Sequence, residues 1–357
     1  MKLFAIIMLI GVGAIVALNT FVDAAGIGTY DRVYELASRQ GAHELVDWQD
    51  LFDQRAWVKA KIERECPDVL ILGSSTVGAL RQEMFGDRRV LNAWLSAPTI
   101  EDFEALTVVL ERAHCQPRSI VVGIDPWFAN AAFGDQRWES LIDDYVAYQP
   151  TASRLRLRAL AMVRAWDLFK ERLNWGTTRA SLAALWTRAR SESPSLPRLV
   201  RAEPDELCAT LTTPHYIRAN DGHYVSCAAF VPSPAVVDDI ARNYVAANTH
   251  EIRNWKEVDP ERMRRLADVV KRWAAHSNVI LVAPPYHPKA WSALQSNPTI
   301  AANLSTLDRE LGALQGAHYI NLRDPGVARC AATEFEDGHH GQPACARKLV
   351  EHLSQAL

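Results

Sequence analysis

Residues 68–76 read Asp-Val-Leu-Ile-Leu-Gly-Ser-Ser-Thr, an apolar run that ends in glycine and is followed by two serines. A continuous apolar run of this length is typical of a strand that is buried on both faces of a parallel sheet. Four further segments have the character of strands, at 89–92, 119–124, 278–283 and 318–322. Helical patterns lie between them, as at 100–113, and one closes the chain at 343–355. Strands that alternate with helices predict an α/β fold with a doubly wound, mainly parallel five-stranded sheet.

The composition is that of a globular protein with a sizeable core. Of the 357 residues, 48% are apolar and 23% are charged, which is sufficient to bury a core. The net charge is −3 and no basic run is present. Both features argue against a nucleic-acid-binding surface.

The N-terminal segment predicts the compartment. Lys2 precedes an uncharged, apolar run at 3–22, and roughly 20 apolar residues are enough for a helix to cross a bilayer. We predict that 1–25 is an uncleaved transmembrane anchor and that 26–65 is a helical stalk and lead-in helix. A secretory signal peptide is the alternative, because Val-Asp-Ala at 22–24 resembles a cleavage site. Both interpretations place the rest of the chain across the membrane.

The cysteines agree with export. Their number, six, is even and their spacing contains no CxxC metal or redox motif, which favours disulfides in an oxidising compartment over free buried thiols. The predicted strand arrangement favours three local pairs: Cys66–Cys115, Cys208–Cys227 and Cys330–Cys345.

The distance between the third and fourth predicted strands indicates an insertion. We assign 66–130 and 256–357 to the α/β domain, and 131–255 is far longer than a crossover connection needs. The inserted segment has a helical pattern at 150–190 and is rich in Pro, Ser and Thr at 191–235. We expect it to be partly helical and to cover one rim of the site.

The first predicted strand ends in a candidate nucleophile. Sites in open α/β sheets form at the carboxyl ends of the strands. Ser75 follows the strand directly, so a tight turn could present its hydroxyl to the cleft beside backbone N–H groups that bind an oxyanion. The alternative is that these serines only cap a helix.

The sequence Asp337-Gly338-His339-His340 supplies a matching acid and base. An Asp three residues before a His can fix the imidazole tautomer, so His340 would act as the general base toward Ser75. His339 is the alternative base. We predict no metal or other cofactor, although His287 and His215 could join a zinc site.

Two other strand ends carry candidate substrate-binding residues. Asp125 and Trp127 follow the third predicted strand, and Tyr286 and His287 follow the fourth in a proline-rich loop. These residues could bind a sugar or an acyl group at the same edge of the sheet. Alternatively, they only close rigid turns.

The order of these motifs resembles that of the SGNH/GDSL hydrolase superfamily, whose fold is flavodoxin-like. Gly73-Ser74-Ser75 after an apolar strand and Asp337-x-x-His340 before the last helix carry the resemblance, which covers about 66–130 and 276–355. More closely, the chain is similar to membrane-anchored bacterial proteins of the alginate O-acetyltransferase and DltD-like type. The resemblance implies that Ser75 is the nucleophile, His340 the base and Asp337 its orienting acid.

The chain departs from the family pattern where the oxyanion is bound. Asn92-Ala93-Trp94 stands where the family has a glycine, and Gly123-Ile124-Asp125-Pro126 stands where it has Gly-x-Asn-Asp. Ser74, Asn92 and Asp125 therefore become the candidates for this part of the site.

The resemblance also implies a function and a location. The chain would be a single-pass protein of the bacterial inner membrane with its main domain in the periplasm. Ser75 would carry an acyl group, acetyl above all, to a hydroxyl of an exported or cell-envelope polysaccharide, and a membrane-bound acyltransferase partner would supply it. The alternatives are an esterase and a non-catalytic scaffold of an envelope polysaccharide assembly system.

Overall fold

The structure is a computed structural model of the chain. It describes residues 2–22, 43–46, 54–150, 153, 157–159, 162, 166, 169–170, 172–190, 199–200, 208–209, 216–227, 231–248 and 252–357.

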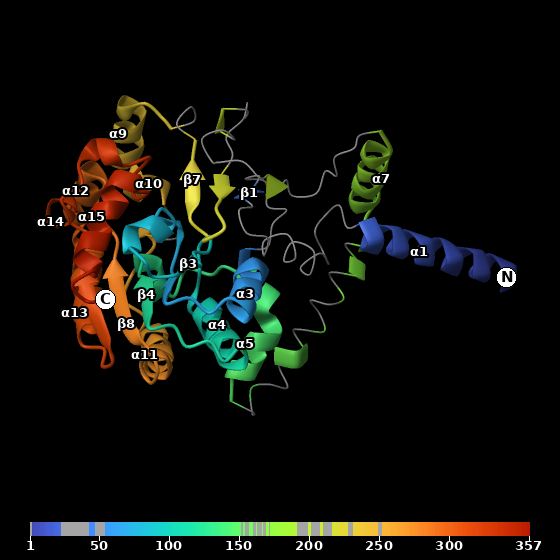
Figure 1. Cartoon of the computed structure of the whole chain (residues 1–357), viewed down its shortest axis with the longest axis horizontal. Coiled ribbons are helices and arrows are strands. Elements are labelled where there is room, and N and C mark those ends of the chain that lie inside the picture. Colours follow the sequence, from blue (N-terminus) through green and yellow to red (C-terminus); the bar gives the residue numbers. More distant parts are fainter. Residues whose placement is uncertain are drawn as a thin grey trace.

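A five-stranded parallel sheet forms the centre of the molecule (Figure 1). Its strands are β2 (Val69–Leu72), β3 (Val90–Asn92), β4 (Ser119–Gly123), β8 (Asn278–Ala283) and β9 (Ala317–Asn321). They lie in the order β3-β2-β4-β8-β9, and every neighbouring pair is parallel. The five strands predicted from the sequence are confirmed.

Helices cover both faces of this sheet. Alternate strand residues face opposite sides, so Leu70 and Val122 belong to one apolar cluster and Ile71 and Val121 to the other. The first cluster includes residues of α4 (Ile100–Arg112), α11 (Pro260–Ala274) and α13 (Pro298–Gly312), and the second includes α15 (Pro343–Leu353). Burial on both faces is the reason why the strand segments 69–72, 120–122 and 279–283 are continuous apolar runs, whereas the edge strand β9 is partly exposed and contains polar residues.

The other described elements outside the two sheets are helices and 3₁₀ turns. The other helices are α1 (Lys2–Val22), α3 (Gln54–Arg64), α5 (Ile142–Tyr148), α7 (Trp175–Arg190), α9 (Pro234–Arg242), α10 (Tyr244–Ala247), α12 (Pro288–Ser296) and α14 (Pro325–Ala328). The 3₁₀ turns are η1 (Ser75–Val77), η2 (Gln82–Phe85), η3 (Pro126–Ala129), η4 (Arg137–Leu141) and η7 (Ala332–Glu334).

Helix α3 lies within the predicted stalk and lead-in segment, and it packs on the α/β domain. It buries Trp57, Val58 and Ile62 in the core cluster that contains α4. Its Arg55 Nε lies 2.6 Å from a carboxylate oxygen of the buried Asp102. Other residues of the predicted stalk, 26–42 and 47–53, lie outside the described residues.

A second sheet was not predicted. It is antiparallel, in the order β5-β1-β6-β7, and joins β1 (His43–Val46) to β5 (Leu199–Val200), β6 (Tyr216–Arg218) and β7 (Tyr224–Ser226). Its strands have two to four residues, too few to produce a clear alternation in the sequence.

The β6–β7 hairpin of the insertion packs against the ends of β2 and β3. The N–H of Tyr224 donates to the Gly78 carbonyl, and the N–H of Asn92 donates to the Asp221 carbonyl. Gly222 has φ +90°, and a Cβ there would lie 2.0 Å from the Asn92 oxygen, so this close approach requires glycine. The inserted hairpin therefore packs against the turn that follows β2 and against the end of β3.

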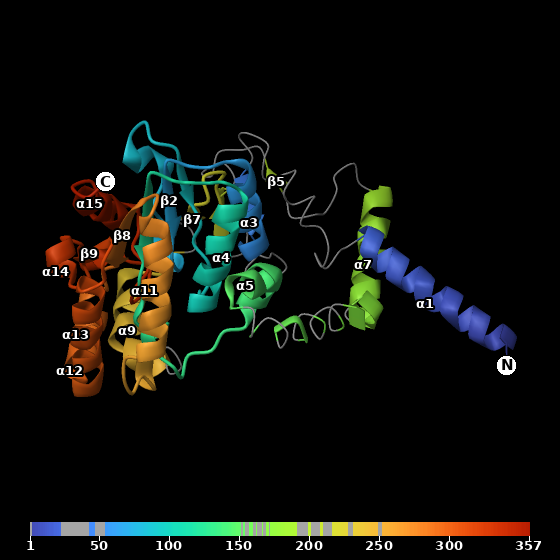
Figure 2. The same cartoon turned by 90° about the horizontal axis from the view of Figure 1, so that it is seen from below.

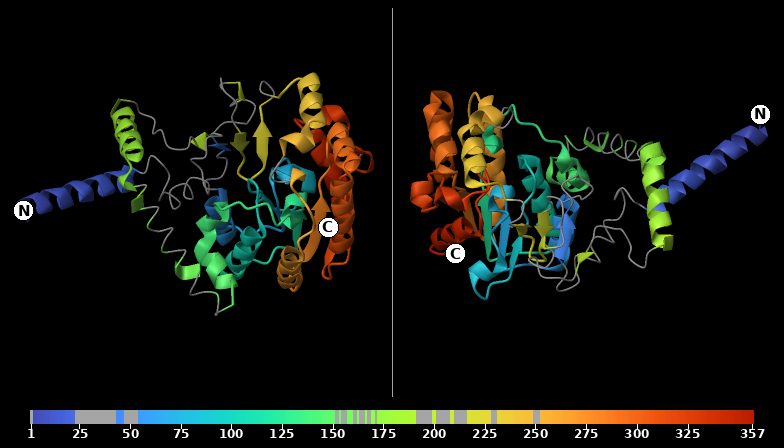
Figure 3. Two further views of the ribbon diagram at one scale, coloured as in Figure 1. Left: turned by 180° about the vertical axis from the view of Figure 1, so that it is seen from behind. Right: turned by 90° about the horizontal axis from the view of Figure 1, so that it is seen from above.

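The first part of the insertion lies elsewhere. Helix α7 packs beside α1, and both helices lie to one side of the sheet domain (Figures 2 and 3). Among the described residues, no helix is both long enough and apolar enough to cross a membrane, so the predicted transmembrane helix is without support from the structure.

The three predicted disulfides are present. Cys66–Cys115 joins the residues before β2 and β4, Cys208–Cys227 fixes the end of the β6–β7 hairpin, and Cys330–Cys345 ties the residues after α14 to α15. Each bond restricts the unfolded chain, and Cys66–Cys115 does so most because its sequence separation of 49 is the longest of the three.

Candidate active site

The turn after β2 presents two serines at the carboxyl end of the sheet. Gly73 has φ +132°, and a Cβ there would lie 2.9 Å from the Gly123 oxygen, so only glycine fits between β2 and β4. Ser74 caps η1, since its Oγ accepts the N–H of Thr76 at 3.1 Å. The capping function thus belongs to Ser74, and the Ser75 side chain is available for another contact.

Ser75, His340 and Asp337 form a continuous chain of hydrogen bonds. Ser75 Oγ lies 2.7 Å from His340 Nε2, and His340 Nδ1 lies 2.6 Å from Asp337 Oδ2. Asp337 Oδ1 accepts the backbone N–H groups of His339 and His340, each at 2.8 Å. The carboxylate is therefore fixed in the orientation that holds the proton of a neutral imidazole on Nδ1 and leaves Nε2 to accept from Ser75.

Asp337 and His340 each stabilise the charged form of the other. Although burial raises the pKa of Asp337, the charges of His340 and His339 and the hydrogen bonds it accepts hold this pKa well below its usual value. Burial lowers the pKa of His340, but the Asp337 carboxylate outweighs burial and raises it above its usual value. The site thus favours an imidazolium beside a carboxylate, the charge state that proton transfer from Ser75 produces.

His339 does not occupy the position of the base. Its ring packs against that of His340 with 4.0 Å between centroids, and its Nδ1 lies 3.6 Å from Asp337 Oδ1. Burial and the charge of His340 lower its pKa to about 4, so it is neutral at pH 7. Of the two adjacent histidines, the structure places His340 against Ser75.

Asp125 lies in the buried layer behind the nucleophile. Thr76 Oγ1 donates to its two carboxylate oxygens at 3.3 and 3.4 Å, and Ser74 is a further hydrogen-bond partner. Burial raises its pKa to about 7 in spite of these bonds. A substantial fraction of Asp125 is therefore protonated at neutral pH and can donate a hydrogen bond.

Asn92 stabilises the turn that follows Ser75 through hydrogen bonds to the backbone. Its side-chain amide is fully buried and donates to the carbonyls of Val77, Gly78 and Leu80, at 2.8, 3.2 and 2.9 Å. Its Oδ1 accepts the N–H of Trp94 at 3.3 Å. The amide is thus engaged with the backbone, in contrast to the oxyanion or substrate contact predicted for it.

The remaining predicted residues are buried around the triad. Trp127 meets the edge of the His339 ring, and Tyr286 packs against Tyr244. His287 begins α12: its Nδ1 accepts the N–H of Lys289 at 3.1 Å. All three predicted side chains are at most 6% exposed, so they shape the interior of the site rather than its surface.

Several residues near the site were not predicted. Ser226 of β7 donates to the Glu336 carboxylate at 2.8 Å and thereby links the inserted hairpin to the loop that carries Asp337. Arg323 is 1% exposed, and its positive charge acts on both Asp125 and Tyr286. It directly follows the last strand segment, so the strand-end rule could have found it. Ser226 gives no comparable signal, because its partner is 110 residues away.

One group of described residues could hold a metal ion. Asp337, His339 and His340 offer ligand atoms that lie within 4.8 Å of one another. Both oxygens of Asp337 already accept hydrogen bonds, so a metal ion would compete with the serine triad for the same atoms. His215 lies outside the described residues.

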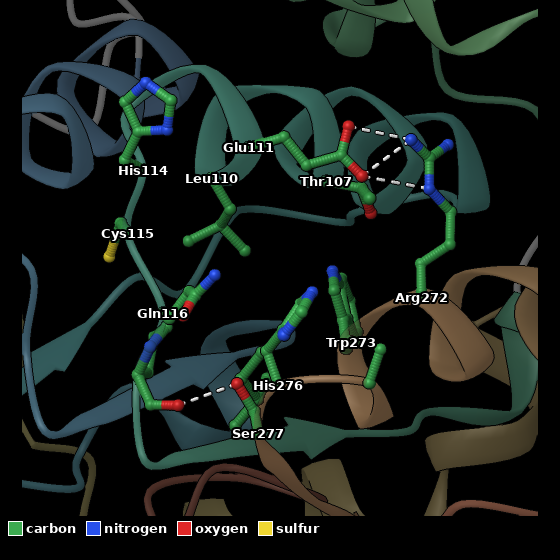
Figure 4. A pocket seen from close by; sticks show the side chains of 13 residues that line it. Thr107, Leu110, Glu111, His114, Cys115, Gln116, Arg272, Trp273, His276 and Ser277 are labelled. Carbon is green, nitrogen blue, oxygen red and sulfur yellow. Dashed lines mark hydrogen bonds and ion pairs between the residues drawn. The ribbon is translucent and has the colours of Figure 1, made fainter.

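Two cavities differ in their relation to the triad. The larger, of about 380 Å³, is lined by residues such as Pro117 and Ser277, which precede β4 and β8, and so lies at the amino-terminal edge of the sheet (Figure 4). A second cavity of about 10 Å³ is lined by Thr76 and His339, the chain neighbours of Ser75 and His340. The smaller one is therefore the cavity that adjoins the candidate chemistry.

Fold and site together define an α/β protein with a Ser–His–Asp arrangement at the carboxyl edge of its parallel sheet. Comparisons with protein-family models, with curated proteins and with solved structures find no match. The resemblance to SGNH hydrolases therefore stays a prediction from the sequence motifs.

Proposed function

We propose that this protein is a serine acyltransferase that moves an acyl group, acetyl above all, to a hydroxyl of an exported or cell-envelope polysaccharide. The observation that carries the proposal is the hydrogen-bonded chain from Ser75 through His340 to Asp337. This arrangement of nucleophile, base and orienting acid supports covalent acyl transfer.

The reaction would proceed through two related steps. Ser75 Oγ attacks the carbonyl carbon of the acyl donor while His340 Nε2 accepts the hydroxyl proton and then delivers it to the departing oxygen. An acceptor hydroxyl next attacks the Ser75 ester, loses its proton to His340, and leaves with the acyl group as Ser75 recovers its proton. Asp337 stabilises the imidazolium that forms in each step.

Oxyanion stabilisation would come from a backbone amide and a protonated carboxyl group. The Ser75 N–H is at the first position of η1, where the helix itself supplies no acceptor. Asp125, with a pKa of about 7 because it is buried, can supply a second donor through the Thr76 hydroxyl that lies between it and the nucleophile turn. Such donors act most strongly in a site that excludes water.

The small cavity beside the triad supports a short acyl group. Its volume of about 10 Å³ is close to that needed by a single water molecule, so it leaves no room for a long acyl chain. Leu80, Ala346 and Leu349 contribute apolar walls. Leu349→Ala should enlarge this space, so the ratio of butyryl-ester to acetyl-ester hydrolysis should rise at least several-fold, and an unchanged ratio would contradict this placement of the acyl group.

The location is part of the proposal. Three disulfides are favoured by an oxidising compartment such as the periplasm. The apolar helix α1 would hold the chain at the bacterial inner membrane, where a membrane-bound acyltransferase could supply acyl groups. This part rests on the sequence of α1 and on the disulfides alone.

The primary test is labelling with a fluorophosphonate probe, followed by mass mapping of the modified residue. We expect the label on Ser75 and its loss in Ser75→Ala. In cells, Ser75→Ala should also abolish the O-acetyl content of the polymer that this protein modifies. Label on another residue, or unchanged O-acetyl content, would contradict the proposal.

An esterase is the second candidate, because the same acyl-enzyme can react with water. A chromogenic acetyl ester, supplied with and without an oligosaccharide acceptor, distinguishes the two: transfer predicts that the acceptor diverts acyl groups from hydrolysis. A non-catalytic scaffold is favoured by the engagement of Asn92 with backbone carbonyls, and it predicts no Ser75 label.

A further inference from the structure

Three tryptophans in the first part of the insertion are strongly exposed. Trp175 and Trp186 of α7 are 72% and 61% exposed, and Trp166 is 59% exposed. In contrast, Trp57, Trp255 and Trp273 of the sheet domain are at most 4% exposed. Large apolar side chains gathered at a surface mark a contact with a partner or a membrane.

Helix α1 extends this apolar surface. Asn19 Nδ2 donates to Thr178 Oγ1 of α7 at 2.9 Å and to the carbonyl of Arg172 at 2.6 Å. Figures 1 and 2 show α7 beside the end of α1 that leads into the rest of the chain. The exposed apolar residues of α1 are Ile6, Ile7, Met8, Leu9, Ile10, Val12, Ile15 and Phe21.

Basic side chains accompany the tryptophans. Among the residues of 153–190 whose exposure is described, the exposed charged ones are Arg158, Lys170 and Arg179, all positive. Tryptophan is enriched where a bilayer meets water, and basic residues are attracted to anionic headgroups. A second copy of the chain would instead oppose identical positive charges across a two-fold interface.

We propose that α7, together with Arg158, Trp166 and Lys170, binds the surface of an anionic lipid bilayer beside α1. This part of the insertion is then a membrane-contacting element, separate from the β6–β7 hairpin that borders the triad. It holds the sheet domain near the bilayer through a second element besides α1. The proposal does not depend on the chemistry of Ser75.

The test is fluorescence quenching of the full chain by vesicles of phosphatidylglycerol that carries bromine on its acyl chains. Bromine quenches only tryptophans close to the lipid. We expect quenching relative to unbrominated vesicles, and we expect the triple variant Trp166→Phe, Trp175→Phe, Trp186→Phe to lose more than half of it. The change to phenylalanine retains an apolar ring and leaves α1 unaltered.

The matched control is the triple variant Trp57→Phe, Trp255→Phe, Trp273→Phe, which also removes three indoles. It should retain the quenched intensity that the exposed set loses. Equal loss in the two variants, or no quenching of the unaltered chain, would overturn the proposal. Because the basic residues are attracted to anionic headgroups, zwitterionic vesicles should quench less than anionic ones. Equal quenching by the two kinds of vesicle would overturn the contribution assigned to the basic residues.

A measurement on the unaltered chain keeps the proposal testable if a variant does not fold. Addition of anionic vesicles should slow hydrogen exchange in peptides from α7 and leave peptides from α13 unchanged. No added protection in α7 would refute the contact. Fluorophosphonate labelling of Ser75 is a separate readout, so either proposal can fail without the other.

Discussion

Replacement of Asp125 by asparagine should stabilise the protein, and the gain should grow with pH. Asp125 is 2% exposed at the end of β4, and burial raises its pKa from 3.8 to about 7. In the unfolded chain the carboxyl group loses its proton near pH 4. Between pH 4 and 7 the folded state therefore binds more protons than the unfolded state, so stability falls as pH rises through this window.

The size of this effect follows from the pKa difference. A difference of about 3 between folded and unfolded pKa values corresponds to about 4 kcal/mol, at about 1.4 kcal/mol per pKa unit. Asparagine cannot ionise and can still accept the hydrogen bond from Thr76. We therefore expect Asp125→Asn to match the unaltered chain near pH 4 and to exceed its free energy of unfolding by up to about 4 kcal/mol at pH 8.

Urea unfolding of both proteins at pH 4, 6 and 8, with the disulfides intact, measures the difference directly. Asp221→Asn is a control of opposite sign: although burial opposes it, the hydrogen bond from His223 holds the pKa of Asp221 below its usual value. The stabilising contribution of Asp221 is present above about pH 4 and is lost only at lower pH, so this variant should be destabilised by a nearly constant amount at pH 4, 6 and 8. A stability difference for Asp125→Asn that stays constant from pH 4 to 8 would refute the reasoning.

Three further predictions concern the triad and its support. His340→Gln should slow fluorophosphonate labelling at least about 100-fold because it removes the base, whereas His339→Gln should change the rate only a few-fold; similar losses in both would contradict the assignment of the base. The labelling rate of Ser75 should rise with pH through a midpoint above 6.5, because Asp337 raises the pKa of His340; a midpoint at or below that value would argue against their pairing. Asn92→Ala should lower the free energy of unfolding by about 2–4 kcal/mol, since it removes the buried hydrogen bonds to the carbonyls of Val77, Gly78 and Leu80. A urea midpoint like that of the unaltered chain would contradict this.

The parallel sheet was predictable because each strand carries its own local signal. Burial on both faces makes the runs at 69–72, 120–122 and 279–283 apolar throughout, a pattern visible without knowledge of neighbouring elements. The carboxyl ends of such strands meet at one edge. Ser75 and the Asp337–His340 segment could therefore be placed together although 265 residues separate Ser75 from His340.

The hairpin at 216–226 and the position of α3 were not predictable in the same way. Strands of two to four residues give no reliable periodicity, and β1 pairs with β5 and β6, which lie far away in the sequence. The contacts of a polar residue at a strand end also depend on residues that the local sequence does not reveal. Asn92 could be recognised as a candidate site residue, but the hydrogen bonds of its side-chain amide depend on where the carbonyls of Val77 and Leu80 lie.

The sequence by itself determined the five parallel strands, the pairing of the cysteines and the residues that could form a triad, because these follow from local apolar runs and from the edge at which parallel strands end. Only the tertiary structure decided which of the adjacent histidines meets Ser75 and that Asn92 supports the turn. It also decided that the β6–β7 hairpin of the insertion packs near the site, whereas α7 packs beside α1. These outcomes depend on the directions of side chains from elements distant in the sequence, and on burial that raises or lowers a pKa only after packing.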